Sequence, residues 1–283
     1  MKVSLAWLRE LAPSSLTDAE ASHRLTMGGL EVEETDPVAG AFTGIVVAHV
    51  RKVSPHPNAD KLRVTEVDAG TGSLLQIVCG APNVAEGQKV PCALVGAALP
   101  GLAIKQAKLR GVESNGMLCS ARELGLSDDH AGLLVLPDDA PVGEDIRRYL
   151  DLDDTILTLK LTPNRGDCLS MSGVARDFAA LAGVKAALPA VAPVAATLAD
   201  TRAVSLSEPK ACGAYYGRVI RGLDAKASTP AWMARRLERA GLRPKSPLVD
   251  ITNFVLHELG QPLHAFDYDA IAGRRAPIFP PAS

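Results

Sequence analysis

The sequence predicts a multidomain α+β protein in which an all-β module interrupts a mixed α/β domain. Short β-rich runs recur between residues 42 and 136 and are separated by clusters of Gly, Pro and Asn. The segments on either side combine helical and strand patterns instead. With 283 residues, of which 47% are hydrophobic and 22% charged, the chain is long enough for two or three domains.

The first segment, residues 1–40, is predicted to begin as a short strand that turns helical within residues 1–11. Residues 17–20 (TDAE) fit a capping box, in which the Thr hydroxyl and the Glu carboxylate bond free amides at a helix start. Gly28 and Gly29 then provide the end of that helix. Residues 30–33 (LEVE) alternate apolar and acidic side chains, which predicts a strand with one solvent-facing side.

The central module is predicted to be a small barrel or sandwich, because turn signals separate its β-rich runs at short, regular spacing. Five strands are expected, which is the number in an OB barrel. The predicted strands cover residues 44–53, 62–67, 74–78, 89–95 and 133–136.

After the module, the mixed pattern returns with a predicted strand at residues 155–161. Asp167 is expected to cap a helix that ends at Gly183 and has one apolar face. Further along, strands are expected at residues 203–206 and 215–220. Two more helices are predicted to start at Thr229–Pro230 and Ser246–Pro247, and to end at Gly241 and near Gly260.

These elements suggest one domain made of two separate pieces of chain, since closely spaced termini make an insertion tolerable. The Ala-, Pro- and Val-rich stretch before residue 200 is typical of a linker. The predicted domains are residues 1–40 with 151–188, the inserted module 41–150, the linker 189–200, and a second mixed region 201–283.

Composition excludes several classes of protein. No apolar run reaches the roughly 18 residues that a membrane span needs, and the start lacks the apolar core of a signal peptide, so we expect a cytoplasmic protein. No metal site is expected, because the cysteines form no CxxC pattern and have no suitably spaced histidine. The five cysteines are predicted to be reduced and mostly buried: Cys79, Cys92, Cys119, Cys168 and Cys212.

Three ordered motifs in the module carry a resemblance to a known domain. HPNADKLRV at 56–64, VCGAPNV at 78–84 and LPGLAIKQAKLRGVESNGMLCSARELGL at 99–126 together resemble the tRNA-binding OB domain found beside several aminoacyl-tRNA synthetases. Residues 161–183 and 235–267, together with the opening MKVSLAWLRELAP, resemble the β subunit of bacterial phenylalanyl-tRNA synthetase. The likeness runs in the family's order along most of the chain.

This resemblance implies an OB domain inserted in an N-terminal α+β domain, followed by the truncated start of an editing domain of the B3/B4 type. It also implies an α subunit as partner in an α2β2 heterotetramer, with tRNA(Phe) as the bound nucleic acid. ATP and Mg²⁺ would serve the whole enzyme, and no cofactor is expected on this chain. Because the family continues far beyond this length, we expect a fragment that neither charges nor edits tRNA by itself.

Basic residues are the candidate tRNA contacts. The module as a whole is close to neutral, with 11 basic and 12 acidic residues over 41–150, and is nearly free of aromatic residues on which bases stack. Residues 202–245, in contrast, hold ten basic and three acidic residues. Contacts to RNA backbone and shape are therefore expected rather than base stacking. The candidates are Lys61, Arg63, Lys105, Lys108 and Arg110 in the module, and Arg235, Arg236 and Arg239 beyond it.

Asn253 and His264 are the candidate editing residues, because the resemblance places both in the pocket that hydrolyses mischarged Tyr-tRNA(Phe). An apolar Phe pocket rejects a substrate with one added hydroxyl poorly, so a second hydrolytic site is the physical solution. Asn can orient an ester, and His can handle a proton or only position a group. Judged without the family, His264 would be a structural histidine.

Two other functions remain open at this stage. One is a stand-alone OB-fold protein that delivers tRNA to another enzyme, for which the segments at 161–183 and 235–267 would be unnecessary. The other is a protein-interaction module without an RNA role, which salt-dependent tRNA binding would exclude.

Overall fold

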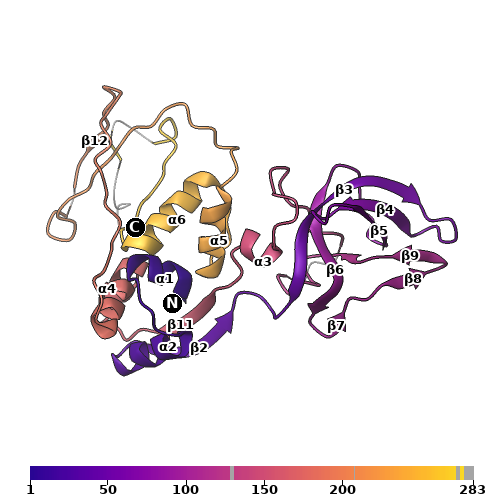
Figure 1. The fold of residues 1–283 in the computed structure, drawn as a ribbon. Coiled ribbons are helices and arrows are strands. Elements are labelled where there is room, and N and C mark those ends of the chain that lie inside the picture. Colours follow the sequence, from indigo (N-terminus) through magenta and orange to yellow (C-terminus); the bar gives the residue numbers. More distant parts are fainter. Residues whose placement is uncertain (128–130, 207, 272–274, 277–283) are drawn as a thin grey trace. The chain divides into compact units, whose positions relative to one another are not determined.

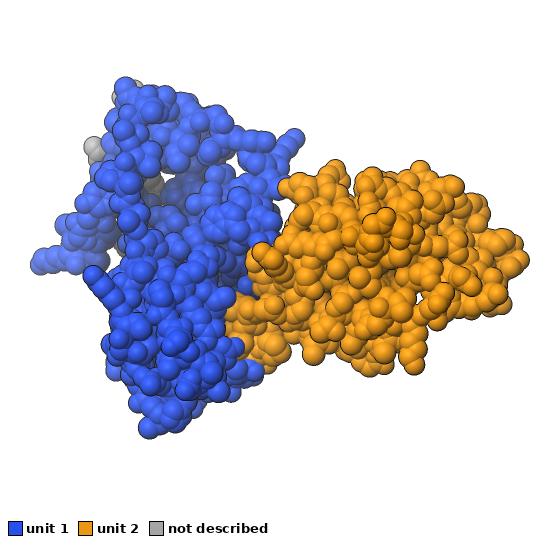
Figure 2. All heavy atoms as spheres, viewed as in Figure 1, with its two compact units in different colours: residues 1–35, 157–283 blue, residues 36–156 orange. Residues whose placement is uncertain are grey.

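The structure is a computed structural model that describes residues 1–127, 131–206, 208–271 and 275–276 (Figure 1). The chain divides into two compact units, Met1–Thr35 with Leu157–Ser283, and Asp36–Ile156 (Figure 2). The mixed α/β character predicted from the sequence is confirmed. In the described residues, every helix is too short or too polar to cross a membrane.

The first unit is built on a three-stranded sheet in the order β1-β11-β2, covered by helices. Its core contains Leu8, Leu25, Leu157, Val174 and Phe178, all fully buried, so both pieces of chain contribute to one hydrophobic cluster. The elements are β1 (Lys2–Ser4), α1 (Leu5–Leu11), α2 (Asp18–Met27), β2 (Glu31–Pro37), β11 (Thr155–Lys160), η1 (Gly166–Cys168) and α4 (Met171–Ala182).

The capping box predicted at the start of α2 is confirmed. The amide of Glu20 donates to the Thr17 hydroxyl at 3.3 Å, and the Glu20 carboxylate accepts from the Thr17 amide at 2.8 Å. These bonds lower the pKa of Glu20, led by the one from the Thr17 backbone. The helix ends at Gly28, as predicted.

The cap predicted for α4 is wrong. Asp167 lies in η1, one turn too early, and Ser170 is the N-cap, with its hydroxyl accepting from the Gly173 amide at 3.0 Å. Asp167 instead binds Arg165 through two hydrogen bonds, which keeps its carboxylate away from the helix start. The predicted end at Gly183 is confirmed, because that residue adopts a left-handed conformation with φ 69°.

The second unit begins and ends where β2 and β11 lie in the same sheet. Just outside these strands, the amide of Val38 donates to the carbonyl of Asp154 at 3.0 Å. Chain entry and exit are therefore adjacent, which is the geometry that an inserted module requires.

The second unit holds one large sheet in the order β10-β6-β3-β4-β5, with β7 paired to β6, and a separate hairpin of β8 and β9. Neighbouring strands in both are antiparallel. The strands are β3 (Thr43–Pro55), β4 (Arg63–Asp68), β5 (Leu74–Cys79), β6 (Lys89–Leu99), β7 (Leu102–Ala103), β8 (Ala107–Leu109), β9 (Val112–Ser114) and β10 (Met117–Leu118), and a short helix α3 (Ile146–Tyr149) follows.

Four of the five predicted strands of the module are confirmed, and the fifth is wrong. Residues 133–136 form no strand; only Leu136 forms an isolated bridge with Lys89. The place beside β6 is taken by β10, which the sequence analysis did not predict. Since the strand order has two ends, the sheet follows an open path.

The C-terminal elements belong to the first unit. Residues 215–220, predicted as a strand, form none: they carry no backbone ladder to Val204 of β12, although a Cβ at Gly217 would lie 3.9 Å from the Val204 side chain. The N-cap of α5 is Pro230 rather than Thr229, whose hydroxyl instead donates to the Asp250 carboxylate. The elements are β12 (Ala203–Val204), α5 (Ala231–Arg239), α6 (Pro247–Leu259) and β13 (Arg275–Ala276), with β12 and β13 paired in parallel.

Candidate nucleic-acid interface and editing residues

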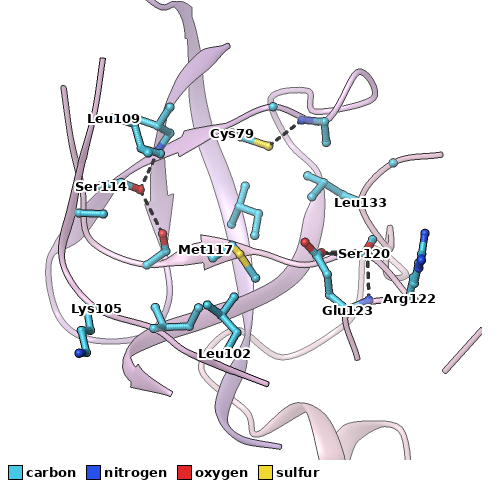
Figure 3. Close-up of a pocket in the computed structure, with 18 of the residues that line it drawn as sticks. Cys79, Leu102, Lys105, Leu109, Ser114, Met117, Ser120, Arg122, Glu123 and Leu133 are labelled. Atoms are coloured by element: carbon cyan, nitrogen blue, oxygen red, sulfur yellow. Dashed lines mark hydrogen bonds between the residues drawn. The ribbon is translucent and has the colours of Figure 1, made fainter. Parts of the chain in front are cut away.

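A pocket of about 880 Å³ opens in the second unit. Figure 3 shows apolar side chains around it, with Lys105 at one side and Arg122 and Glu123 at another. Half of the lining residues lie in the stretch from β7 to β10, and the rest come from residues 78–82 at and after the end of β5, from 120–123 and from 132–133. Its apolar lining includes Leu102, Leu109, Met117, Leu118 and Leu133.

The HPN motif holds the β8–β9 hairpin beside this pocket. His56 is buried, its Nδ1 accepts from the Asn58 amide at 3.0 Å, and its Nε2 lies 3.1 Å from the Leu109 carbonyl. Because Nδ1 is an acceptor, the ring is the tautomer with a proton on Nε2, which donates to Leu109. The Asn58 side chain donates to the Arg110 carbonyl at 3.0 Å. These bonds bring the loop that carries Lys61 next to the hairpin turn.

Arg110 occupies the first position of a two-residue hairpin turn. Its φ is 48° and that of Gly111 is 93°, which is the backbone of a type I′ turn. A positive φ disfavours a side chain as large as Arg, so this residue is held at the tip at a cost in backbone energy. Non-glycine residues in such conformations cluster at functional sites.

The pocket wall is fixed by buried polar groups. Ser114, which is 3% exposed, accepts from the Val78 amide at 3.0 Å and donates to the Gly116 carbonyl at 3.1 Å. A Cβ at Gly116 would lie 2.7 Å from the Ala93 carbonyl oxygen, so the position requires glycine. On another side, the Asn83 amide exchanges two hydrogen bonds with the Leu133 backbone.

The module is nearly neutral overall, but its basic residues differ in whether they are paired with acids. Five of its eleven basic residues are engaged: Arg51, Lys52, Arg147 and Arg148 form ion pairs with acids, and Lys89 donates to the Ala140 carbonyl. The other six form no ion pair with any residue that the structure describes, although Arg63 donates to the Asp60 and Leu62 carbonyls at 3.1 and 3.2 Å. This unpaired basic set consists of Lys61, Arg63, Lys105, Lys108, Arg110 and Arg122.

The unpaired basic set includes all five of the module's predicted tRNA contacts. The loop and hairpin described above bring four of them, Lys61, Arg63, Lys108 and Arg110, to one region, and Lys105 lines the pocket. Sequence reasoning missed Arg122, because no spacing rule connects it to the hairpin. Its turn is held by Glu123, whose carboxylate accepts from the Ser120 amide at 2.6 Å, and that pairing could have been found as a capping-box pattern.

The thiols of this unit are not poised for chemistry. Burial raises the pKa of Cys79, and it raises the pKa of Cys92 to about 12. Burial also raises the pKa of Cys119, with Glu123 adding to the effect. A thiol with a raised pKa is a poor nucleophile, so the pocket is suited to binding rather than covalent catalysis. All five cysteines are free, as predicted.

The basic residues of α5 that were predicted to contact tRNA are less free than those of the module. The Arg236 guanidinium binds the Glu10 carboxylate at 2.5 and 2.6 Å and lies over the rings of Trp7 and Trp232 at 4.9 and 5.8 Å. Arg235 and Arg239 are partly buried on the same helix. Arg236 is thus already paired with an acid. The module therefore offers more basic residues without an acidic partner than α5 does.

The candidate editing residues lie on and just after α6. Asn253 is partly buried within the helix, and His264 is exposed in the following segment, with its ring 6.0 Å from that of Phe266. Within the described residues, no hydrogen bond joins Asn253 to His264.

A compact polar cluster in the first unit was not predicted from the sequence. Arg165 lies between Asp167 and Asp177 and contacts the Cys168 sulfur at 2.8 Å. The two carboxylates and the thiol lie close enough together to hold a metal ion. The guanidinium fills that space, however, so the cluster fits a structural ion pair that fastens the turn before α4.

Comparison with known domain families defines the class. Residues 45–145 match the family described as "Putative tRNA binding domain", and residues 211–278 match the B3/4 domain. The pocket and the unpaired basic set lie within the first match, and Asn253 and His264 lie within the second. The chain is thus a protein with a tRNA-binding-type domain and a B3/4 domain.

Individual relatives narrow this class. Over 96% of its length the chain is homologous to phenylalanine--tRNA ligase β subunits, with 61% identity to that of Dechloromonas aromatica and 60% to that of Ralstonia nicotianae. It spans about a third of these relatives, 34% in each case. Among solved structures, a MetRS related protein from Pyrococcus horikoshii matches 36% of this chain and 87% of its own at 26% identity, with a TM-score of 0.28.

Proposed function

We propose that this chain supplies a tRNA-binding surface and part of the editing site of a phenylalanine--tRNA ligase β subunit. The observation that carries the proposal is the 61% identity to such a subunit over 96% of the chain. The partner would be the α subunit, in an α2β2 assembly that uses ATP and Mg²⁺ to charge tRNA(Phe). In this proposal, the pocket of the second unit takes no part in charging tRNA(Phe).

The unpaired basic set is the proposed RNA contact. Cations without acidic partners can neutralise phosphates without first breaking an ion pair, and each neutralised phosphate releases counterions. The pocket that Lys105 and Arg122 line has aliphatic rather than aromatic walls, so it favours backbone and sugar contacts over base stacking. A five-stranded OB barrel as the underlying fold is supported by the path β10-β6-β3-β4-β5 together with one contact between its ends, where the Asn115 amide just before β10 donates to the Gln76 carbonyl of β5 at 2.9 Å.

The proposed editing role rests on Asn253 and His264. Asn253 presents an amide that can orient the ester of a mischarged Tyr-tRNA(Phe), and exposed His264 can approach an attacking water. The second hydrolytic step would discriminate by the tyrosine hydroxyl, which an apolar Phe pocket excludes poorly.

Salt-dependent binding of tRNA(Phe) to the 283-residue chain tests the first part of the proposal. Fluorescence anisotropy across a NaCl series should give a steep decrease in affinity. Each of Lys108→Ala and Arg110→Ala should reduce the slope of log K against log[salt] by roughly one unit.

Arg148→Ala is the matched control, because Arg148 is exposed on the same unit and is paired with Glu144 at 3.7 Å. It should leave the slope unchanged. A lack of salt-dependent tRNA binding would favour the alternative of a protein-interaction module, whereas an unchanged slope in Lys108→Ala and Arg110→Ala would remove the hairpin from the interface.

A further inference from the structure

Helix α6, which carries Asn253, is stacked against the first helix of the chain. The Phe254 ring lies 5.4 Å from that of Trp7, with an angle of 6° between the ring planes. Trp232 of α5 contacts Phe254 from its edge, at 5.2 Å and 88°. Trp7 itself is 2% exposed and belongs to the core of the first unit. The residue beside Asn253 is therefore anchored to that core.

An ion pair closes over this aromatic stack. Arg236 of α5 binds Glu10 of α1 through both carboxylate oxygens, and its guanidinium also lies over the Trp7 ring. A guanidinium placed between a carboxylate and an aromatic face gains from both contacts. This pair joins residues 226 positions apart in the sequence.

Both ends of α6 are also fixed. At its start, the Asp250 carboxylate, which is fully buried, accepts from the Lys245 amide at 2.9 Å and from the Thr229 hydroxyl. At its end, Gly260 lies against Ser170 so closely that a Cβ would be 3.3 Å from the Ser170 side chain. Ser170 is the N-cap of α4, so the point from which the His264 segment departs also touches the N-terminal core.

We propose that Trp7, Glu10 and Arg236 are positioning residues for the editing site, and that helix α1 holds α6 in the orientation that presents Asn253 and His264. This inference rests on the proposed editing function. It assigns the N-terminal helix a role in hydrolysis that its place outside the B3/4 match would not suggest. None of the three residues is required to touch the substrate.

The physical basis is the sensitivity of hydrolysis to geometry. Misplacement of a reacting group by about 1 Å can cost roughly 100-fold in rate. With the Trp7 stack removed, α6 would keep its own hydrogen bonds but lose the contact that fixes its rotation. We expect local opening of α6 and the segment after it, without unfolding of the second unit.

Amide hydrogen exchange of the 283-residue chain tests the structural step directly. In Trp7→Leu and Glu10→Ala, exchange over residues 247–266 should become about tenfold faster. Trp7→Phe keeps a ring for the stack and should restore protection. Arg9→Ala is the matched control, because it removes an ion pair from the same helix, that with Asp18 of α2. If Trp7→Leu fails to fold, the Glu10→Ala and Trp7→Phe arms still decide the question.

Deacylation tests the functional step. A chimeric ligase can be made in which this chain replaces the matching third of the Dechloromonas aromatica β subunit. Trp7→Leu and Glu10→Ala should lower kcat for hydrolysis of Tyr-tRNA(Phe) roughly 10- to 100-fold while Phe charging stays unchanged. Arg9→Ala should leave both rates unchanged.

His264→Ala and Asn253→Ala in the same chimera separate the two proposals. If these variants lose deacylation but Trp7→Leu and Glu10→Ala keep it, the positioning role is wrong and the editing assignment stands. If His264→Ala and Asn253→Ala hydrolyse Tyr-tRNA(Phe) normally, the editing assignment itself is wrong. Unchanged exchange in Trp7→Leu and Glu10→Ala would overturn the positioning role regardless of activity.

Discussion

Arg110 combines an unfavourable backbone conformation with a charge at the tip of a hairpin. Its φ of 48° belongs to the left-handed region, which glycine adopts without the steric cost borne by other residues. Arg110→Gly should therefore raise the free energy of unfolding by up to about 1 kcal/mol, since part of the relief is offset by a more flexible unfolded chain. The same change should weaken tRNA binding and reduce its salt slope.

Asp151→Gly provides the control for this prediction. Asp151 is the other non-glycine residue with positive φ among those the structure describes, at 52°, and it does not line the pocket. Urea unfolding should show a similar or smaller gain, with tRNA affinity unchanged. A loss of stability in Arg110→Gly would contradict the view that this backbone is strained.

Glu258 on α6 has a carboxyl group that folding makes harder to ionise. Burial raises the pKa of its carboxyl above the ordinary value of 4.5, and the nearby Arg236 guanidinium only partly counteracts this effect. An acid whose pKa is raised by folding favours the folded state at low pH and loses that contribution as pH rises through the folded pKa. Glu258→Gln should thus increase the free energy of unfolding at pH 7.

The gain from Glu258→Gln should shrink as the pH falls through the raised folded pKa towards 4.5, and below 4.5 the wild-type carboxyl is protonated in both states. Chemical denaturation of both proteins across this range measures the difference. A gain that is the same at every pH would show that the effect is not linked to protonation.

At the scale of elements, the turn before α4 depends on the Arg165 cluster. The Arg165 guanidinium lowers the pKa of Asp167 from 3.8 to about 2. A carboxyl whose pKa is lowered by folding contributes stability that is complete above its ordinary pKa and lost as pH falls through the folded value. Unfolding free energy should therefore decline between pH 3.8 and about 2, and Asp167→Asn should flatten that decline.

Arg165→Gln is the partner variant for this prediction. It removes the cause of the lowered pKa, so it should flatten the same part of the curve. The double variant should be no flatter than either single variant, because both remove one interaction. Additive effects would mean that Asp167 draws its stability from another group.

Elements with signals in their own sequence were predictable, whereas elements that depend on distant partners were not. The capping box at residues 17–20 and the Pro247 start of α6, directly after its N-cap residue Ser246, are signals within a few residues of the helix they begin. Residues 133–136 have the composition of a strand, but β10 occupies the place beside β6. Asp167 was drawn from its predicted cap by Arg165, a competition that propensity does not reveal.

The candidate site also has features that local sequence predicts and features that only the fold reveals. Motifs identified five basic residues of the module, but their lack of acidic partners is a property of the folded unit. Arg236 was predicted to meet tRNA on charge alone, and only the fold shows Glu10 bound to it. Asn253 and His264 came from the family resemblance, and their roles remain predictions.

At the scale of the whole molecule, the chain passes from one unit to the other twice, and the two passages lie next to each other. The Val38–Asp154 hydrogen bond closes the base of the second unit, so the two ends of this unit lie together in the folded chain. Residues 36–156 also contain separate hydrophobic clusters of their own. Excised at these positions, the unit should fold cooperatively, with amide exchange protection in β3, β4 and β6.

The excised unit also separates the two basic regions of the chain. It retains the whole unpaired basic set and lacks α5, so it should bind tRNA(Phe) with nearly the same salt slope as the 283-residue chain. The reciprocal protein, with Thr35 joined to Leu157 by a short Gly-Ser linker, should keep the core around Phe178 but bind tRNA with a much smaller slope. Anisotropy titrations of both proteins over one NaCl series make the comparison. A full slope in the reciprocal protein would place the main contacts on α5, where Arg235 and Arg239 lie, and remove the pocket from the interface.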